Sequence, residues 1–275
     1  LDAISCAYCI NLEGRTDKWK NFEQSARKVG YEFHERIQRF EAIDGAQATE
    51  TEEVNRVWES ALDAEYNPKQ PKGPKIMTTG EVGCALSHIA LWRKLVVAGD
   101  ESDHHSQMLI LEDDCQFATF RGHDQFAFAF ARAWADLPSD WGILYLGFSP
   151  RGEFIYVQQQ PASDKHYKRN DAQDVTIDIF TPSYGYHTHA YMITRKAAEI
   201  LLDHLPVTGP IDVFLADNNW FGIPTYCAVI ANEGWPRGDP PSESFSVLWV
   251  PPWLHSSASF FWVPDLFSVV PRLNL

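Results

Sequence analysis

The sequence lacks several features that would have narrowed its class at once. No apolar run in the 275 residues reaches the roughly 20 residues of a membrane-spanning helix, so we expect no membrane span in this chain. Because the first residue is Leu1 rather than Met, we expect any signal or anchor upstream to have been removed or left out of this sequence. Lys and Arg form no cluster, and the net charge is -14. Nucleic acid is held by basic patches, so we expect no nucleic-acid partner.

Cysteine is scarce, and its five positions form no disulfide framework, since their number is odd in a long chain. Cys6 and Cys9 do form a C-x-x-C pattern within a strand-like run. A separation of three residues in a strand points side chains to opposite faces. We therefore interpret the cysteines as small buried apolar groups rather than as a metal or redox site.

The remaining composition is that of an ordinary globular protein. Hydrophobic residues make up 45%, aromatic residues 13% and charged residues 22%, which is enough for one sizeable core. We predict a single domain over residues 1–275. Its segment 234–275, rich in Pro, Trp, Phe and Ser, is expected to wrap that domain rather than form another.

Hydrophobic periodicity predicts strands that alternate with helices. Expected strands cover residues 4–12, 40–43, 108–111, 142–148 and 187–193, and expected helices cover 16–30, 78–99, 126–134, 194–205 and 210–217. An amphipathic turn is expected over 54–61, an exposed Pro- and Lys-rich loop over 68–75, and a long polar loop over 152–178. The order predicts an α/β fold with a mostly parallel sheet covered on both faces.

The stretch M-L-I-L-E-D-D places three carboxylates, Glu112, Asp113 and Asp114, at the end of a buried strand. Ligands of open parallel sheets bind just beyond such carboxyl ends. A hard divalent ion, Mn²⁺ or Mg²⁺, suits these oxygen ligands and can share its remaining positions with substrate phosphates. In an alternative interpretation the carboxylates cap the following helix or pair with Arg121.

Two further groups could accompany the acidic strand end. His187 and His189 should project to one side of a strand, where one imidazole could complete a metal site; they could equally be ordinary polar residues. We interpret His104 and His105 as part of a solvated loop.

In the helix that Thr78 and Glu81 cap, we expect Glu81, Cys84, Ser87 and His88 to lie near one another, opposite much of the apolar face. Such a helix start could bind hydroxyls or phosphates.

Taken in order, five groups of motifs resemble glycosyltransferase family 25. They are I-N-L-E-G-R-T-D-K-W, F-E-A-I-D-G, T-G-E-V-G-C-A-L-S-H-I-A-L-W, L-I-L-E-D-D, and H-A-Y-M-I-T-R-K-A-A-E-I-L-L with P-I-D. The resemblance implies a GT-A type fold, a UDP-sugar donor, a divalent metal and transfer with inversion. It also implies a glycan or protein-linked hydroxyl as acceptor. A eukaryotic member would act in the secretory lumen, and a bacterial one in the cytoplasm or at the membrane periphery.

The resemblance, combined with the residues, assigns roles to named side chains. We assign the metal to Glu112, Asp114 and His189, and the donor to Asn11, Leu12, Arg15, Asp44, Gly83, Ser87, His88 and Asp113. The family usually has two adjacent Arg after N-L-x and a further Arg after the Asp, where this chain has Gly14, Arg15 and Lys18. Arg15 is retained, which favours a phosphate or uracil contact.

An inverting transfer needs a base for the acceptor hydroxyl. Asp212 is the first candidate because it opens a short helix after a Pro-containing turn, with Asp217 and Glu233 as reserves. Two other functions remain open. A nucleotidyltransferase or other phosphoryl-transfer enzyme could use the same acidic strand end, although no P-loop pattern is present. A non-catalytic relative could keep the fold for carbohydrate binding or adhesion.

Overall fold

The computed structural model describes residues 6–48, 51–59, 61–67, 73–98, 106–115, 117, 130–131, 133–157, 176–216 and 221–231. Its centre is a six-stranded sheet in the order β10-β7-β8-β6-β1-β2. The strands are β1 (Cys6–Asn11), β2 (Ile37–Glu41), β6 (Gln107–Glu112), β7 (Ile143–Tyr156), β8 (Thr176–Thr194) and β10 (Thr225–Ala231). Only β8 runs against its neighbours, so the predicted mostly parallel sheet is confirmed.

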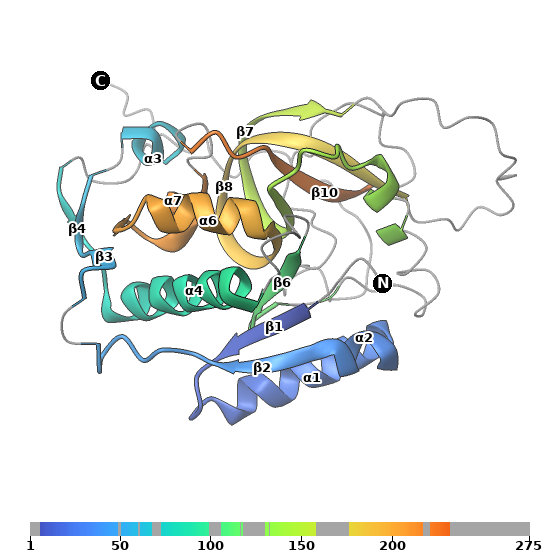
Figure 1. Ribbon diagram of the computed structural model, residues 1–275, viewed down its shortest axis with the longest axis horizontal. Coiled ribbons are helices and arrows are strands. Elements are labelled where there is room, and N and C mark those ends of the chain that lie inside the picture. Colours follow the sequence, from blue (N-terminus) through green and yellow to red (C-terminus); the bar gives the residue numbers. More distant parts are fainter. Residues whose placement is uncertain are drawn as a thin grey trace, which may run out of the picture.

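Helices cover both faces of this sheet (Figure 1). One face packs against α4 (Thr79–Ala98), α6 (Arg195–Asp203) and α7 (Ile211–Ala216), and the other against α1 (Thr16–Val29) and α2 (Tyr31–Arg36). Alternate residues of each strand serve the two layers: Ile110 packs with the α4 layer, whereas Leu109 and Leu111 pack with the α1 layer. Cys9 lies in the α1 layer and Cys6 packs against the α4 layer, which confirms their opposite faces.

Local sequence signals explain where the main helices begin. Glu81 N–H donates to Thr78 Oγ1 at 3.2 Å, while Thr78 N–H donates to Glu81 Oε2 at 2.6 Å, which is the predicted capping box. Thr194 Oγ1 accepts from Ala197 N–H at 3.2 Å and caps α6 as predicted. The described part of the predicted helix 126–134 is also helical.

Three predicted segments differ from the structure in bounds or type. The short strand expected over 40–43 is present as β2, but it covers Ile37–Glu41, because it pairs in parallel with β1 from Ala7 onward. The expected turn over 54–61 is instead β3 (Val54–Asn55) and β4 (Val57–Trp58), followed by α3 (Ala61–Tyr66). These short strands pair with β9 (Val207–Thr208) and β5 (Lys75–Ile76), partners that local periodicity does not reveal.

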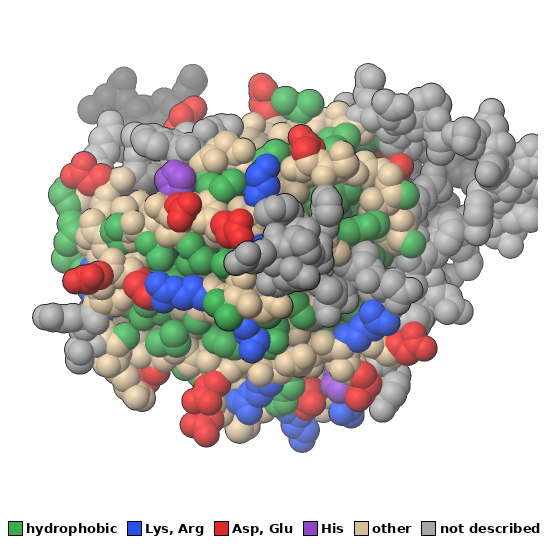
Figure 2. All heavy atoms as spheres, viewed as in Figure 1, with side chains coloured by type: hydrophobic (Ala, Val, Ile, Leu, Met, Phe, Trp, Pro, Cys, Tyr) green, Lys and Arg blue, Asp and Glu red, His purple; other side chains and the backbone are tan. Residues whose placement is uncertain are grey.

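The long loop expected over 152–178 is also wrong at both ends. Strand β7 continues to Tyr156 and β8 begins at Thr176, and the two pair antiparallel from Ile143↔Ile193 to Tyr156↔Phe180. Backbone hydrogen bonds between β7 and β8 hold these residues in strands, so the sequence need not alternate apolar and polar residues there. None of the described helices is long and apolar enough to cross a membrane. Figure 2 shows acidic and basic side chains interspersed over the described part of one face.

Candidate active site

The predicted acidic cluster lies at the carboxyl end of β6, where β8 passes beside it in the opposite direction. His189 Nδ1 lies 2.9 Å from Asp114 Oδ1, and Thr188 Oγ1 donates to Glu112 Oε1. Ligand atoms of Glu112, Asp114 and His189 all lie within 4.8 Å of one another. Two carboxylates and one imidazole are a donor set that suits Mn²⁺, so the predicted residues fit such an ion.

Glu112 is held as an anion despite its burial. Burial alone would raise the pKa of this carboxyl, but the interactions with His88, Thr188 and His189 outweigh it and lower the pKa to about 2. For His189, burial acts to lower the pKa, and the hydrogen bond and charge of Asp114 reverse the direction and raise it. Glu112 therefore stays negatively charged at neutral pH, whereas Asp114 favours the protonated form of His189.

His88 does not lie on an open polar face of the helix, as the sequence suggested. Its side chain is 0% exposed, because α4 packs against the sheet and against α6 and α7 at this point. Nδ1 lies 2.8 Å from Tyr191 Oη. Nε2 points toward Glu112 Oε1 at 3.6 Å and has no hydrogen-bond partner among the described residues. His88 therefore contacts Glu112 from the protein interior, and it is not exposed to contact a sugar-nucleotide donor directly.

Ser87 is likewise buried rather than solvent-facing. Its hydroxyl donates to Gly83 O at 2.7 Å and accepts from Ile43 N–H at 2.9 Å, which ties the β2–β3 connection to α4. Glycine is required where these backbones meet: a Cβ on Gly83 would lie 2.5 Å from Ile43 O, and one on Gly45 would lie 1.9 Å from Thr79 O. Gly83 is thus a packing glycine in the wall of a cavity.

That cavity has a volume of about 260 Å³ and collects most of the predicted donor residues. It is lined by Ile10, Asn11, Leu12, Arg15, Ala42, Ile43, Asp44, Gly45, Thr79, Gly80, Gly83, Cys84, Ser87, Glu112 and Asp113. Arg15 and Leu12 are exposed at its rim. Asp44 binds its own turn, accepting from Ala46 N–H at 2.9 Å and from Gln47 Nε2 at 3.0 Å. Of the predicted donor residues, only His88 does not line the cavity.

Asn11 connects this cavity to the acidic cluster. Its Nδ2 donates to Asp113 Oδ2 at 2.6 Å and to Arg15 O at 3.1 Å. Burial raises the pKa of Asp113, and the bond from Asn11 opposes that shift. Arg39, which the sequence analysis missed, donates from Nε to Asn11 Oδ1 at 2.9 Å and from its guanidinium to Leu12 O at 3.2 Å. Nothing marks Arg39 in the sequence, since its role depends on the β1–β2 pairing.

Asp212 lies in the first turn of α7. Its Oδ2 accepts from His187 N–H and its Oδ1 from Val213 N–H, both at 2.9 Å. Burial raises the pKa of Asp212, although both hydrogen bonds oppose the shift. A carboxylate with a raised pKa is a competent proton acceptor. The reserves Asp217 and Glu233, and also His104, His105 and Arg121, lie outside the described residues.

His187 joins Asp212 to the metal-ligand candidates. Its φ of 68° is positive, the only such value among the described non-glycine residues. The rings of His187 and His189 stack with centroids 5.0 Å apart, which confirms that both project to one side of β8. Ser149 Oγ lies 2.9 Å from His187 Nδ1. A strained backbone held by several contacts is typical of functional sites.

A second, larger cavity of about 580 Å³ opens on the other side of Asp212. It is lined by Trp58, Asp63, Tyr66, Asn67, Lys75, Ile76, Thr78, Glu81, Arg151, Tyr186, His187, Pro210, Asp212 and Val213. Sequence reasoning did not single out Asp63, Lys75 or Tyr186, which meet in this cavity from α3, β5 and β8. Their spacing in sequence gives no signal.

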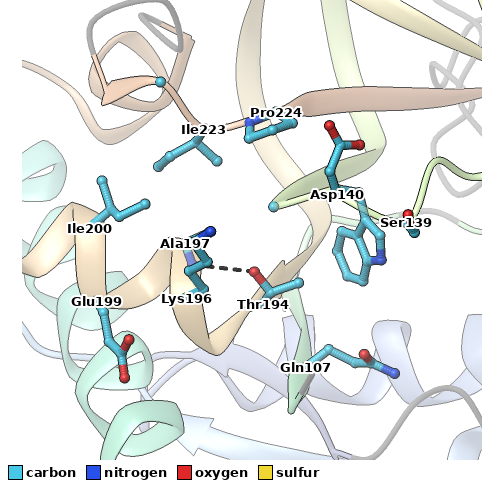
Figure 3. Close-up of a pocket in the computed structure, with 13 residues that line it drawn as sticks. Gln107, Ser139, Asp140, Thr194, Lys196, Ala197, Glu199, Ile200, Ile223 and Pro224 are labelled. Carbon is cyan, nitrogen blue, oxygen red and sulfur yellow. Dashed lines mark hydrogen bonds between the residues drawn. The ribbon is translucent and has the colours of Figure 1, made fainter. Parts of the chain in front are cut away.

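A third cavity, of about 610 Å³, lies at the opposite end of the sheet (Figure 3). Its walls come from α6 and from the segments that lead into β6, β7 and β10. Figure 3 shows the apolar side chains of Ile200 and Ile223 facing one another, with Thr194 bonded to Ala197 below them. None of the predicted site residues lines this cavity.

The sheet, its two helical layers and the acidic strand end define the class of the molecule as an α/β protein of GT-A-like fold. The chain matches the description "Glycosyltransferase family 25 (LPS biosynthesis protein)" over residues 5–215. It therefore belongs to glycosyltransferase family 25.

Curated relatives share this segment of the chain. A glycosyltransferase 25 family member of Anopheles gambiae is 26% identical over 78% of this chain and 31% of its own length. Procollagen galactosyltransferase 2 of Mus musculus is 24% identical over 76% of this chain and 29% of its own. Inactive glycosyltransferase 25 family member 3 of Homo sapiens is 28% identical over 54% of this chain and 22% of its own. The chain thus spans less than a third of the length of these relatives.

Proposed function

We propose that the protein is a metal-dependent inverting glycosyltransferase that moves a hexose, with galactose as the first candidate, from a UDP-sugar to a hydroxyl of a glycan or protein. The observation that carries the proposal is that the acidic cluster is connected to two cavities. Glu112 lines the cavity of the predicted donor residues. His187, whose ring stacks on that of His189, donates its backbone N–H to Asp212 in the larger cavity. The family membership and the names of the relatives support the same activity.

In this proposal Glu112, Asp114 and His189 would hold Mn²⁺ or Mg²⁺. The bound ion would supply Lewis-acid stabilisation of the charge on the departing diphosphate. Asn11 and Arg39 fix the turn after β1, so that Arg15 and the backbone beside it can contact the nucleotide. His88 and Thr188 keep Glu112 ionised and oriented, as groups behind a ligand commonly do.

Asp212 would accept the proton of the attacking hydroxyl. The acceptor oxygen bonds to the anomeric carbon while the bond to UDP breaks, and UDP leaves with the electron pair. Because attack and departure occur on opposite faces of the sugar, the base and the diphosphate must lie on opposite sides of it. Asp212 lines the larger cavity and not the cavity of the predicted donor residues, which suits that requirement.

The test is a donor screen that measures UDP release with Mn²⁺ across several UDP-sugars, with a glycan array as the acceptor source. We expect UDP release with one sugar nucleotide and its loss when EDTA is added. Calorimetry with the same nucleotides runs in parallel. Absence of UDP-sugar binding at saturating Mn²⁺ would overturn the proposal. Pyrophosphate release from nucleoside triphosphates would favour a nucleotidyltransferase, and glycan binding without turnover would favour a non-catalytic relative.

A further inference from the structure

The cavity beside Asp212 contains a buried polar cluster, formed by Asp63, Lys75 and Tyr186, that the stability of the fold does not require. Asp63 is 2% exposed, and its carboxylate accepts from Lys75 Nζ at 2.7 Å and from Tyr186 Oη at 2.8 Å. A buried ion pair loses much of its Coulomb energy to desolvation, so it is weak evidence of a stabilising role. Burial and the bond to Asp63 raise the pKa of Tyr186, so its hydroxyl remains a neutral donor and acceptor.

The charges in the lining nearly cancel. Three carboxylates (Asp63, Glu81, Asp212) face two cations (Lys75, Arg151). Asp63 already pairs with Lys75, and Glu81 caps α4. A phosphate or polyanionic ligand would meet more negative than positive groups here. The cavity therefore favours a ligand without net charge.

The same lining mixes aromatic rings with planar polar groups. Tyr66 stacks on Tyr184 with centroids 4.7 Å apart, and Tyr186 lies under the guanidinium of Arg151 at 5.3 Å. These contacts fix the rings while the hydroxyl and carboxyl groups around them offer both donors and acceptors. Sugar hydroxyls also donate and accept, and the apolar CH groups of a pyranose pack well against the faces of aromatic rings.

The shape points to a compact ligand rather than an extended chain. Side chains come from seven elements (β4, α3, β5, α4, β7, β8 and α7) and converge on one concavity of about 580 Å³. This volume lies within the range of small-molecule sites. An extended peptide is usually bound along a strand edge through backbone hydrogen bonds, yet β7 and β8 pair with each other at Arg151↔Tyr184.

We propose that this cavity binds a neutral pyranose, so that the acceptor is the terminal sugar of a glycan rather than a hydroxyl on a peptide. The assignment of this sugar as acceptor rests on the proposed function; the binding of the sugar does not. Asp212, at the boundary of the cavity, takes the proton of the sugar hydroxyl that attacks the donor. Asp63 and Tyr186 contact or orient the other hydroxyls.

Saturation-transfer NMR on the full chain without donor or metal tests the inference. The probes are the methyl pyranosides of glucose, galactose and N-acetylglucosamine, with a hydroxylysine-containing peptide as competitor. We expect at least one glycoside to bind, and Tyr186→Phe to weaken it about five- to tenfold, since a hydrogen bond contributes about 1 kcal/mol. Tyr226→Phe is the matched control, because Tyr226 also donates to a carboxylate, that of Asp140 at 3.3 Å, at the other end of the sheet.

The outcomes separate this inference from the proposed function. Binding of the peptide but of no glycoside, or equal affinity of both variants and wild type, would overturn the pyranose site. If Tyr186→Phe does not fold, as judged by its melting transition, Arg151→Ala replaces it, because that side chain is exposed. If a glycoside binds but calorimetry detects no UDP-sugar binding, only the proposed glycosyltransferase activity is overturned. The protein would then be a carbohydrate-binding protein.

Discussion

Two cavities of similar volume lie at opposite ends of the sheet, about 580 Å³ beside Asp212 and about 610 Å³ beside Thr194. The first contains a buried ion pair, a carboxyl with a raised pKa and a residue with positive φ. The second is bordered by an ordinary helix cap and by the exposed Lys196 (Figure 3). Volume alone therefore does not distinguish the two cavities, whereas the strain and the shifted pKa values favour the first as the candidate site.

The sharpest way to test this difference is to remove the proposed base. Asp212→Asn should lower turnover by about a hundredfold to ten-thousandfold, because the amide cannot accept the proton, while affinity for UDP-sugar and Mn²⁺ is retained. Steady-state kinetics and calorimetry measure the two quantities. Asp140→Asn, at the opposite end of the sheet, is the control and should leave turnover unchanged. If Asp212→Asn turns over within about threefold of wild type, Asp212 is not the general base, and Asp217 or Glu233 becomes the candidate.

The pH profile examines the same carboxyl. Burial raises the pKa of Asp212, so its base form is lost at a higher pH than for an ordinary Asp. We expect kcat at saturating metal to fall, as pH decreases, with a midpoint above 3.8. By linkage, a raised carboxyl pKa favours the folded protein at low pH and costs stability as pH rises through the folded value. Asp212→Asn should therefore show a flatter dependence of unfolding free energy on pH above 3.8. An unchanged slope would contradict this.

Loss of a metal-ligand candidate should have the next largest effect. Asp114→Ala should weaken Mn²⁺-dependent UDP-sugar binding about a hundredfold, because it removes one of three protein ligands. The side chain is 45% exposed, so the fold should survive. Calorimetry with and without Mn²⁺ measures the change, and Asp140→Ala is the matched control at the other end. If Asp114→Ala and Asp140→Ala bind the donor with equal affinity, Asp114 is not a metal ligand.

His88→Ala examines the support beneath Glu112. We expect the unfolding free energy to fall by about 2 to 3 kcal/mol, because a buried hydrogen-bonded side chain is lost and Tyr191 is left without this partner. Turnover per folded molecule should fall about tenfold as Glu112 loses its nearest imidazole. Denaturant unfolding and kinetics corrected for folded fraction separate the effects. A stability loss with normal kinetics would make His88 purely structural.

The smallest effect concerns backbone strain at His187. Since only glycine adopts positive φ without cost, His187→Gly should be about 1 kcal/mol more stable than His187→Ala. At Ala190, an extended position of the same strand, Ala190→Gly should instead lower stability. Thermal unfolding of the three variants suffices. If His187→Gly is no more stable than His187→Ala, the positive φ stores no strain.

The sequence predicted the parts of the site whose signals are local. The strand that ends in Glu112, Asp113 and Asp114 was found from its apolar run, and the starts of α4 and α6 from their caps. Residues that share one end of the sheet could then be grouped by the rule that ligands bind at strand ends.

Features that depend on distant partners were not predictable. The burial of His88 follows from the packing of α4 against the sheet, α6 and α7, which are distant in sequence and which the helical period of α4 alone does not reveal. Arg39 matters only because β2 pairs with β1, which places it beside Asn11. The polar stretches of β7 and β8 pair with each other and need no apolar alternation.

Four consecutive residues of β8 each serve a different part of the site. Tyr186 contacts Asp63, His187 contacts Asp212, Thr188 contacts Glu112 and His189 contacts Asp114. For anyone redesigning this protein, substitutions among these neighbours should combine non-additively. A one-residue deletion just before them would shift the register and exchange the faces of all four side chains at once. New acceptor preferences are therefore easier to evolve from α3 and β5, on the far wall of the cavity, than from this strand.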